Sequence, residues 1–179
     1  MVRRTSLKEI IGTEYEVDFL NAIKNFNCQD KDVEKFLKEQ SVEFNKRRKS
    51  RTYLFFDEDD SSEIIILGYF TLTMKNLPFN DGVSKTTIKK IDGFFKDVSS
   101  TEAVLIGQLG KNQDYKTQIS GKLILDMAME VAYASSDLIG GRIVFLECAN
   151  NEKVVKFYAE NGFVFLQESG DYLQMIRYL

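Results

Sequence analysis

The sequence predicts an α/β (α+β) fold in which a mixed sheet carries helices on both faces. Two observations lead to this class. Runs rich in β-branched and aromatic residues, RTYLFF at 51–56 and EIIILGYFTLTM at 63–74, have the composition of a strand hairpin. Farther along, two continuous apolar runs at 103–109 and 142–148 alternate with helical patterns, as fully buried strands do in a sheet that is covered on both faces.

The first half of the chain adds helices to this hairpin. Residues 30–46 repeat apolar side chains at helical spacing, and Asp30 is placed to cap the first turn. Residues 14–27 are ambiguous between a helix and irregular structure. The polar run 57–62 is expected to be a solvated turn between the two strands, and a short helix is expected over Ser84–Phe95.

The second half continues with alternating elements. In its first helix polar residues fall only at Lys122, Asp126 and Glu130, so most of that helix surface is expected to be buried. The second helix begins at Asn151 and has Gly162 just past its end, where a left-handed residue is favoured. The predicted segments are a polar loop, these two helices and two closing strands, at 110–121, 122–134, 151–161, 163–166 and 172–178.

Composition excludes several classes of protein. The 179 residues suit one domain over 1–179, and 44% hydrophobic with 28% charged residues indicate a globular protein. The chain has no histidine, which excludes Ser-His-Asp and Cys-His catalysis. Its two cysteines, Cys28 and Cys148, lie far apart, so no metal site is expected and both thiols are expected to be reduced. Without a membrane-length apolar run or a signal peptide, we expect a cytoplasmic protein that does not enter a membrane.

The polar loop before the first of these helices has the setting of an anion site. A helix N-terminus offers free N–H groups and partial positive charge, and residues 116–121 (KTQISG) lie there. Lys116 and Lys122 add charge to this segment. An ordinary strand-to-helix turn would produce the same pattern, so the loop alone leaves both interpretations open.

The second helix favours the anion site over an ordinary turn, because its sequence resembles a known family. The segment 151–163 resembles the pattern Asn-x-x-Ala-x-x-Phe/Leu-Tyr-x-x-x-Gly-Phe of the GNAT superfamily of N-acetyltransferases. Valine stands in the alanine place, and the pattern follows a buried strand as it does in that superfamily. The matching residues are Asn151, Phe157, Tyr158, Gly162 and Phe163. The resemblance implies a central mixed, mostly antiparallel sheet and acetyl-CoA as the co-substrate.

The first half resembles a narrower group, the acetyltransferase toxins of bacterial toxin–antitoxin pairs. The resemblance covers roughly residues 26–165. Those toxins have a Phe-x-Cys element, a helix with a Phe-Leu pair, an Arg-Thr-Tyr strand and a Gly-Tyr strand. Their counterparts here are Phe26–Cys28, Phe36–Leu37, Arg51–Tyr53 and Gly68–Tyr69.

This chain departs from the family pattern at two positions. Gln108 stands on the central strand where the toxins tend to have arginine, and Ile119 replaces the middle glycine of the pyrophosphate loop. A β-branched residue disfavours a positive φ and restricts how closely a phosphate can approach. The loop is therefore expected to bind the cofactor differently from its relatives, or weakly.

The resemblance assigns roles to particular residues. Tyr158 takes the place of the acid that protonates the departing CoA thiolate, although a packed aromatic would show the same spacing. Asn151 is either a helix cap or a contact to the pantetheine arm, or both. Backbone groups near Leu109–Lys111 would polarise the thioester. The expected acetyl-CoA contacts are Leu109, Gly110, Lys111, Lys116, Thr117, Gln118, Ile119, Ser120, Gly121, Lys122 and Asn151.

The acceptor of the acetyl group is expected to be a primary amine that attacks the thioester directly. No general base is obvious, and Glu147 is the acidic residue that would be tested as a water-mediated one. A lysine amine, with a pKa of about 10.4, is almost wholly protonated near neutral pH, whereas an α-amine, with a pKa of about 7.7–8.0, is roughly a quarter to a third neutral. An enzyme without a base therefore favours α-amines.

A basic segment suggests how such an acceptor could be held. The cations Lys46, Arg47, Arg48, Lys49 and Arg51 are either a solvated helix end or a phosphate-contacting patch, joined by Lys85, Lys89 and Lys90 if these lie nearby. Because the toxin relatives acetylate aminoacyl-tRNA, tRNA is a candidate partner.

Three functions remain open from the sequence. The first is an N-acetyltransferase for the α-amine of aminoacyl-tRNA, and the second is one for a small-molecule or protein amine. The third is a degenerate domain that binds acetyl-CoA or a partner without turnover, which the change at Ile119 favours slightly. The toxin resemblance also suggests a homodimer and an antitoxin partner.

Overall fold

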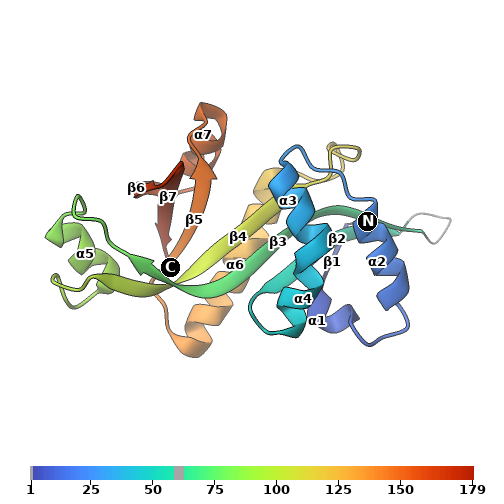
Figure 1. Ribbon diagram of the computed structural model, residues 1–179, viewed down its shortest axis with the longest axis horizontal. Helices are drawn as coiled ribbons and strands as arrows, with labels where there is room; N and C mark the ends of the chain where they lie inside the picture. Colours follow the sequence, from blue (N-terminus) through green and yellow to red (C-terminus); the bar gives the residue numbers. More distant parts are fainter. Residues whose placement is uncertain (1, 59–62) are drawn as a thin grey trace. The chain divides into compact units, whose positions relative to one another are not determined.

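The structure, a computed structural model, describes residues 2–58 and 63–179 (Figure 1). Of the expected polar turn at 57–62, the first two residues end a strand and the others lie outside the described residues.

In the described residues the strands form one seven-stranded sheet in the order β1-β2-β3-β4-β5-β7-β6. The β4–β5 pair is parallel, whereas β1–β2, β2–β3, β5–β7 and β6–β7 are antiparallel. The expected mixed, mostly antiparallel sheet is confirmed. The strands are β1 (Arg3–Ser6), β2 (Arg51–Glu58), β3 (Ile64–Pro78), β4 (Ser100–Lys111), β5 (Ile143–Ala149), β6 (Val164–Ser169) and β7 (Tyr172–Tyr178).

The helices agree with the sequence pattern where local caps fix them. Asp30 accepts hydrogen bonds from the N–H groups of Asp32 and Val33, and Ser84 caps the short helix that follows β3. The ambiguous segment 14–27 contains a helix. The helices are α1 (Leu7–Ile10), α2 (Glu16–Lys24), α3 (Lys31–Lys35), α4 (Ser41–Lys46), α5 (Lys85–Asp92), α6 (Gly121–Ile139) and α7 (Glu152–Glu160).

The predicted helix over 30–46 contains a π-helical turn at Phe36–Gln40, which joins α3 to α4. The N–H of Ser41 donates to the carbonyl of Phe36, five residues back. The Ser41 hydroxyl donates to the carbonyl of Leu37 at 2.6 Å, so the widened turn keeps its acceptors occupied.

The chain divides into two compact units, which we describe separately. The first contains the residues up to 73 together with 108–128, and the second contains 74–107 and 129–179. The expected single domain over 1–179 stays a prediction.

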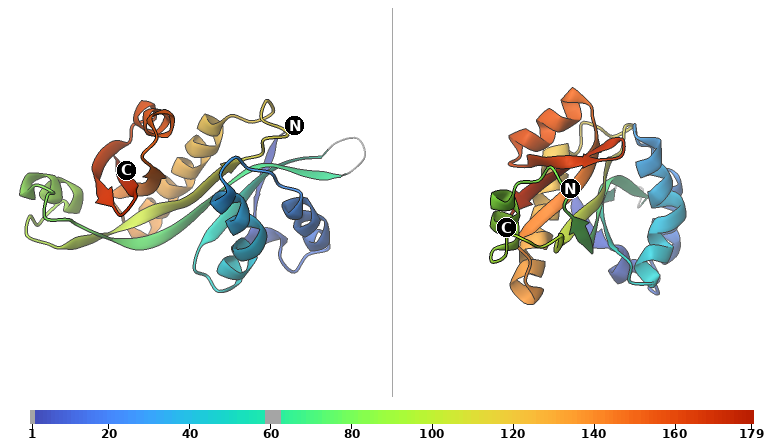
Figure 2. Two further views of the ribbon diagram at one scale, coloured as in Figure 1. Left: turned by 45° about the horizontal axis from the view of Figure 1, so that its top comes forward. Right: turned by 60° about the vertical axis from the view of Figure 1, so that its left-hand side comes forward.

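In the first unit, helices α1 to α4 cover one face of the strands β1 to β3 (Figure 2). Phe19 packs edge-on against Phe56 at 5.0 Å between ring centroids, and Phe26 does so against Tyr69 at 5.6 Å. The start of α6 covers the other face, where Arg4 of β1 reaches Met127. Helices therefore lie on both faces, as expected.

The second unit has its own apolar core between β4, β5, β7 and α5. Its buried members are Leu77, Ile91, Ala103, Leu105, Ile143, Phe145 and Ile176.

Three expectations about burial and extent are corrected. Only Ala103–Ile106 of the strand predicted at 103–109 is buried, and Glu147 of the strand predicted at 142–148 is exposed. The helix predicted over 122–134 runs to Ile139 and buries one face rather than most of its surface, since Leu123 and Tyr133 are 39% and 40% exposed. The sequence pattern also predicted neither β1 nor α1. Helix α1 begins with a capping box between Ser6 and Glu9.

Candidate active site

The loop expected to hold the pyrophosphate runs from 112 to 120, because β4 extends to Lys111. Ser120 caps α6, and its hydroxyl accepts the N–H of Leu123 at 3.0 Å. The first turn of α6 then leaves the N–H groups of Gly121 and Lys122 as candidates for an anion. The Lys122 ammonium is held at 2.5 Å from the Asp126 carboxylate, which reduces the charge that it can offer.

Ile119, which replaces the middle glycine of the family's loop, does not adopt a positive φ. Its side chain is 3% exposed, so it points into the core of the first unit. Among the described non-glycine residues only Arg48 has a positive φ, so Ile119 avoids the strained conformation. The buried isoleucine therefore anchors the loop without a positive φ, and the expectation that the loop binds the cofactor differently or weakly stays a prediction.

Asn112 fixes the start of the loop to β3. It is 2% exposed, and its backbone N–H and side-chain amide donate to the carbonyls of Leu67 and Ile66, both at 2.8 Å. Its side-chain oxygen accepts the N–H of Asp114 at 3.1 Å. Every polar group of this side chain is thus used to shape the loop. In the sequence, Asn112 is one polar residue of the predicted loop, and no pattern indicates this role.

The Phe-x-Cys element holds the same loop from the other side. Cys28 forms an antiparallel bridge with Asn112, and the carbonyl of Asn27 accepts the N–H of Gln113 at 2.8 Å. The Asn27 amide donates to the Asp114 carboxylate at 3.0 Å. The Cys28 thiol is buried, and burial raises its pKa, so the thiol is neutral and structural.

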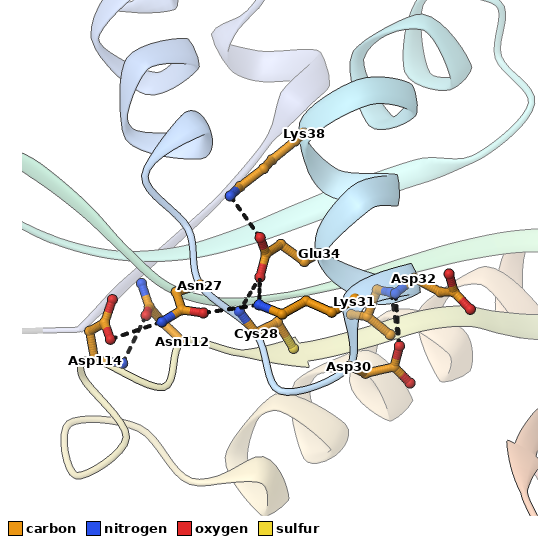
Figure 3. Close-up of polar contacts among 10 residues, drawn as sticks. Asn27, Cys28, Asp30, Lys31, Asp32, Glu34, Lys38, Asn112 and Asp114 are labelled. Atoms are coloured by element: carbon orange, nitrogen blue, oxygen red, sulfur yellow. Dashed lines mark hydrogen bonds and ion pairs between the residues drawn. The ribbon is translucent and has the colours of Figure 1, made fainter.

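Glu34 fastens this element to α3 (Figure 3). Its carboxylate accepts the N–H of Cys28 at 2.9 Å and lies 2.7 Å and 2.9 Å from the ammonium groups of Lys31 and Lys38. The hydrogen bonds from Lys31, Cys28 and Lys38 lower the pKa of Glu34 from its ordinary value of 4.5 to about 2. This carboxylate therefore stabilises the loop anchor only while it is ionised.

Glu34→Gln is expected to reduce the free energy of unfolding at pH 7 by about 1–2 kcal/mol. Because the folded pKa is lower than the unfolded one, the stabilisation is complete above about pH 4.5 and is lost as the pH falls towards 2. Urea unfolding of both proteins between pH 7 and 2 should show the difference shrinking over that range. Glu39→Gln, at an exposed residue of the π-helical turn that follows α3, is the control. An unchanged difference at pH 2.5 would contradict this role.

Gly110, at the end of β4, is buried between two side chains of the first unit. A Cβ there would lie 2.8 Å from both Tyr69 Cε1 and Val33 Cγ1. The Tyr69 hydroxyl donates to the Val33 carbonyl at 2.5 Å, and burial raises the pKa of Tyr69 far above its ordinary value. The neighbouring Lys111 ammonium donates to the carbonyl of Lys116 at 3.3 Å and so spans the loop.

In the second unit, Tyr158 on α7 is half-buried among Phe157 and Phe163, whose ring centroids lie 5.1 Å and 5.8 Å away. Burial, and the nearby Cys148, raise the pKa of Tyr158 well above its ordinary value, so the phenol keeps its proton at neutral pH. The ring is packed, as the simpler interpretation required, but the hydroxyl forms no hydrogen bond with any residue in 2–58 or 63–179. Packing and a donor role are therefore compatible.

Asn151 caps α7, which its position predicted. Its side-chain oxygen accepts the N–H groups of Lys153 at 3.0 Å and Val154 at 3.4 Å, and Gly162 ends the helix with a φ of 83°. The candidate base Glu147 is exposed on β5 and accepts a hydrogen bond from the Gln174 amide at 2.8 Å. Its carboxylate is thus accessible to solvent.

The basic segment is sorted by the structure into two groups. Arg47 forms an ion pair with Glu43, and Lys49 lies over the Phe44 ring at 5.6 Å. The other cations line a hollow of about 380 Å³ in the first unit together with side chains of α1 and its end, and none of them pairs with a described carboxylate. The lining residues are Lys8, Ile11, Asn45, Lys46, Arg48 and Arg51.

Arg48 ends α4 in a Schellman motif, in a conformation that normally takes glycine. Its N–H donates to the carbonyl of Asn45 at 3.1 Å, and the N–H of Lys49 donates to that of Phe44 at 2.9 Å. Its φ of 58° costs an L-residue roughly 1–2 kcal/mol. An arginine thus stands where glycine would be favoured, and this arginine lines the hollow.

The predicted site residues thus fall into separate groups. Leu109–Lys122 and the basic hollow belong to the first unit, whereas Asn151 and Tyr158 belong to the second. Lys85 pairs with Asp97 and Lys90 lies over Tyr178, both in the second unit, so these lysines are engaged there. In the described part of the chain no cluster of side chains suits a metal ion, and no helix has the length and apolar character of a membrane span.

Comparison with known proteins shows the fold. No known family's sequence profile matches the chain, and no curated protein does. Among solved structures, a tyrosine-to-phenylalanine mutant of KacT is 24% identical with a TM-score of 0.75, covering 99% of this chain and 94% of that one. AtaT complexed with acetyl-methionyl-tRNAfMet is 22% identical with a TM-score of 0.74, covering 98% and 94%. AtaTR bound with acetyl-CoA is 21% identical with a TM-score of 0.71, covering 99% and 93%.

These neighbours are GNAT-fold acetyltransferase toxins of toxin–antitoxin systems. The chain described here has their fold over nearly its whole length, which confirms the resemblance seen in its motifs.

Proposed function

We propose that this protein is an acetyl-CoA-dependent N-acetyltransferase that modifies a primary amine, and that its acceptor is the α-amine of aminoacyl-tRNA. The observation that carries the proposal is Tyr158. It stands at the acid position of the GNAT pattern, it keeps its proton at neutral pH, and its hydroxyl has no hydrogen-bond partner among the described residues. The fold shared with AtaT, whose complex contains acetyl-methionyl-tRNAfMet, supports the choice of acceptor.

The proposed reaction needs no covalent enzyme intermediate. The neutral amine forms a C–N bond to the thioester carbon, and the C–S bond breaks. The departing thiolate takes the phenolic proton of Tyr158, and the proton lost by the new amide's nitrogen returns through water to restore the phenol. Alignment of the two reactants supplies much of the acceleration. This chemistry suits a chain without histidine.

The loop 112–120 and the start of α6 are proposed to bind the pyrophosphate of acetyl-CoA. Gly121 and Lys122 would offer N–H groups, and Lys111 and Lys116 would add positive charge. The anchors at Asn112 and Ser120 order the loop before any ligand arrives, which lowers the entropic cost of binding. Backbone groups at Leu109–Lys111 would polarise the thioester. Asn151, which caps α7, is also proposed to contact the pantetheine arm.

Calorimetry with acetyl-CoA tests the cofactor site. Wild type is expected to bind in the micromolar range, and Gly121→Glu is expected to abolish binding, because a carboxylate at the first turn of α6 repels the pyrophosphate and fills its place. Gly82→Glu is the matched control, since a Cβ at Gly82 meets nothing within 4 Å. Absence of binding in wild type would overturn the acetyltransferase proposal, and binding without turnover on any amine would leave a degenerate domain.

The basic hollow is proposed to contact phosphates of the RNA acceptor. Arg48→Gly tests this proposal because it should change protein stability and RNA affinity in opposite directions. Glycine relieves the positive φ, so the variant should be more stable by about 1 kcal/mol. It should nevertheless bind aminoacyl-tRNA more weakly, with the slope of log K against log salt reduced by about 0.7–0.9 for one lost phosphate contact. Arg47→Gln, at a cation already paired with Glu43, should change neither slope nor affinity.

Unchanged RNA binding in Arg48→Gly, together with turnover of small amines, would favour a small-molecule or protein acceptor instead. A cytoplasmic location, a homodimer and an antitoxin partner are proposed with the same function. The toxin AtaT has been solved with the C-terminus of the antitoxin AtaR, which supports the last of these.

A further inference from the structure

Two adjacent phenylalanines after α5 are unusually open to solvent. Phe94 and Phe95 are 77% and 60% exposed, and their ring centroids lie 4.8 Å apart with an interplanar angle of 67°. Apolar side chains that are exposed next to each other can mark an interaction site, whereas a single exposed apolar residue needs no such explanation. Neither residue belongs to the proposed acetyl-transfer machinery.

The turn that presents these rings is ordered. Gly93 ends α5 with a φ of 90°, and the Asp92 carboxylate accepts the N–H groups of Phe94 at 3.1 Å and Phe95 at 2.7 Å. The Arg142 guanidinium donates to the Ile91 carbonyl at 3.2 Å and lies against Gly93. Hydrogen bonds therefore fix the backbone that carries the two exposed rings.

A hollow of about 410 Å³ lies beside the rings and is positively charged. Its lining carboxylate, Asp97, is held by Lys85 at 2.6 Å, and this hydrogen bond lowers the pKa of Asp97. Lys89 and Lys96 form no ion pair with a described carboxylate, although the charge of Lys96 also helps to lower the pKa of Asp97, so both ammonium groups can contact a ligand. The lining residues are Lys89, Phe94, Phe95, Lys96, Asp97 and Val98.

The chemistry of this surface favours one kind of occupant. A symmetric dimer would press two copies of this positively charged face together, and their like charges would repel. Phe94 and Phe95 contribute largely exposed rings to a hollow that also carries charge, so they suit a flat partner face more than a wholly apolar anchor. Single-stranded nucleic acid offers flat bases for stacking and phosphates for the lysines, in the combination that such sites use.

We propose that Phe94 and Phe95, together with Lys89 and Lys96, form a binding site for single-stranded RNA that stacks bases without reading their sequence. The site rests on the proposed function only in taking RNA as the nucleic acid. It would hold an unpaired segment of the acceptor, separately from the basic hollow of the first unit.

The chain offers a direct spectroscopic test. It contains no tryptophan, so Phe94→Trp introduces a single reporter at the proposed site. Titration with a single-stranded oligoribonucleotide of about eight nucleotides should quench its fluorescence, because a base stacks on the indole. A tryptophan placed instead at Phe165, which is 56% exposed on β6, should respond little. Equal quenching at both positions, or none at Phe94→Trp, would overturn the proposal.

A leucine pair separates stacking from ordinary apolar contact. Phe94→Leu with Phe95→Leu keeps an apolar surface but removes the ring faces, so RNA affinity measured by fluorescence anisotropy should fall about tenfold or more. Lys89→Gln and Lys96→Gln should each reduce the salt slope by about 0.7. Circular dichroism and acetyl-CoA affinity should be unchanged in all of them, since these side chains are exposed.

Two other results would assign the surface differently. Unchanged RNA binding in the leucine pair would remove the stacking site. Self-association of wild type that is lost in Phe94→Ala with Phe95→Ala, with RNA affinity intact, would assign the face to a second copy of the chain. All these experiments measure RNA binding and not acetyl transfer. They therefore test this site even if the protein proves to have no acetyltransferase activity.

Discussion

Tyr158→Phe is expected to lower kcat for acetyl transfer to methionyl-tRNA by about 10²- to 10⁴-fold, the range for loss of a positioned proton donor. The phenyl ring preserves the packing against Phe157 and Phe163 and removes only the hydroxyl, which has no hydrogen-bond partner among the described residues. Affinity for acetyl-CoA measured by calorimetry should stay the same. Single-turnover kinetics with labelled acetyl-CoA gives the rate of the chemical step.

The pH profile adds an independent check. In wild type the rate should rise as the α-amine loses its proton and then stay level to about pH 10, because burial raises the pKa of Tyr158 and keeps the phenol protonated. Tyr172→Phe, at a 48% exposed tyrosine of β7, is the control and should be fully active. A Tyr158→Phe enzyme with the wild-type rate would show that the ring serves packing alone.

Gly68→Ala is expected to reduce the free energy of unfolding by about 3 kcal/mol, near the upper end for overpacking. A Cβ at Gly68 would lie 2.6 Å from Ile124 Cδ1 and 2.9 Å from the Gly110 carbonyl oxygen. The isoleucine can rotate away, but the carbonyl belongs to the backbone of β4 and cannot. Denaturant unfolding measures the change.

The same substitution at Gly107 is the matched control for Gly68. It lies on β4, where the nearest atom to a new Cβ is 3.9 Å away, so Gly107→Ala should be neutral or slightly stabilising. Acetyl-CoA affinity should also fall in Gly68→Ala alone, because the displaced Gly110 adjoins the proposed cofactor loop. Equal stability of the two variants would contradict the close approach of β3 and β4.

The features that the sequence predicted well are set by short-range interactions. The caps at Asp30 and Asn151 and the left-handed Gly162 depend on neighbours within a few residues, and all three are observed. The hairpin of β2 and β3 follows from uninterrupted β-branched and aromatic runs. Such signals are visible in one sequence because the residues that cause them are adjacent in it.

Other features depend on partners far along the chain. Asn112 reads as one more polar loop residue, and only its bonds to β3, more than forty residues away, show that it shapes the loop. From the sequence, Ile119 is an unfavourable replacement for a glycine of the loop, whereas in the structure its buried side chain anchors that loop. β1 is only four residues long, and its pairing with β2 leaves no local pattern.

The π-helical turn at Phe36–Gln40 sets the rotational phase between two functions of one helix. Each residue of an α-helix turns the chain by about 100°, and a π turn absorbs one extra residue without changing the direction of the axis. Before the turn, α3 carries Glu34, which anchors the loop, and after it α4 ends in Lys46 and Arg48 at the basic hollow. Because the turn absorbs the extra residue, deleting one residue within it should restore an ordinary α-helix and keep Glu34 and the cations in their present relative orientation, whereas deleting one residue of α4 should rotate the cations by about 100°. The π-helical turn thus lets the helix contain one extra residue while Glu34 and the cations stay in phase with each other.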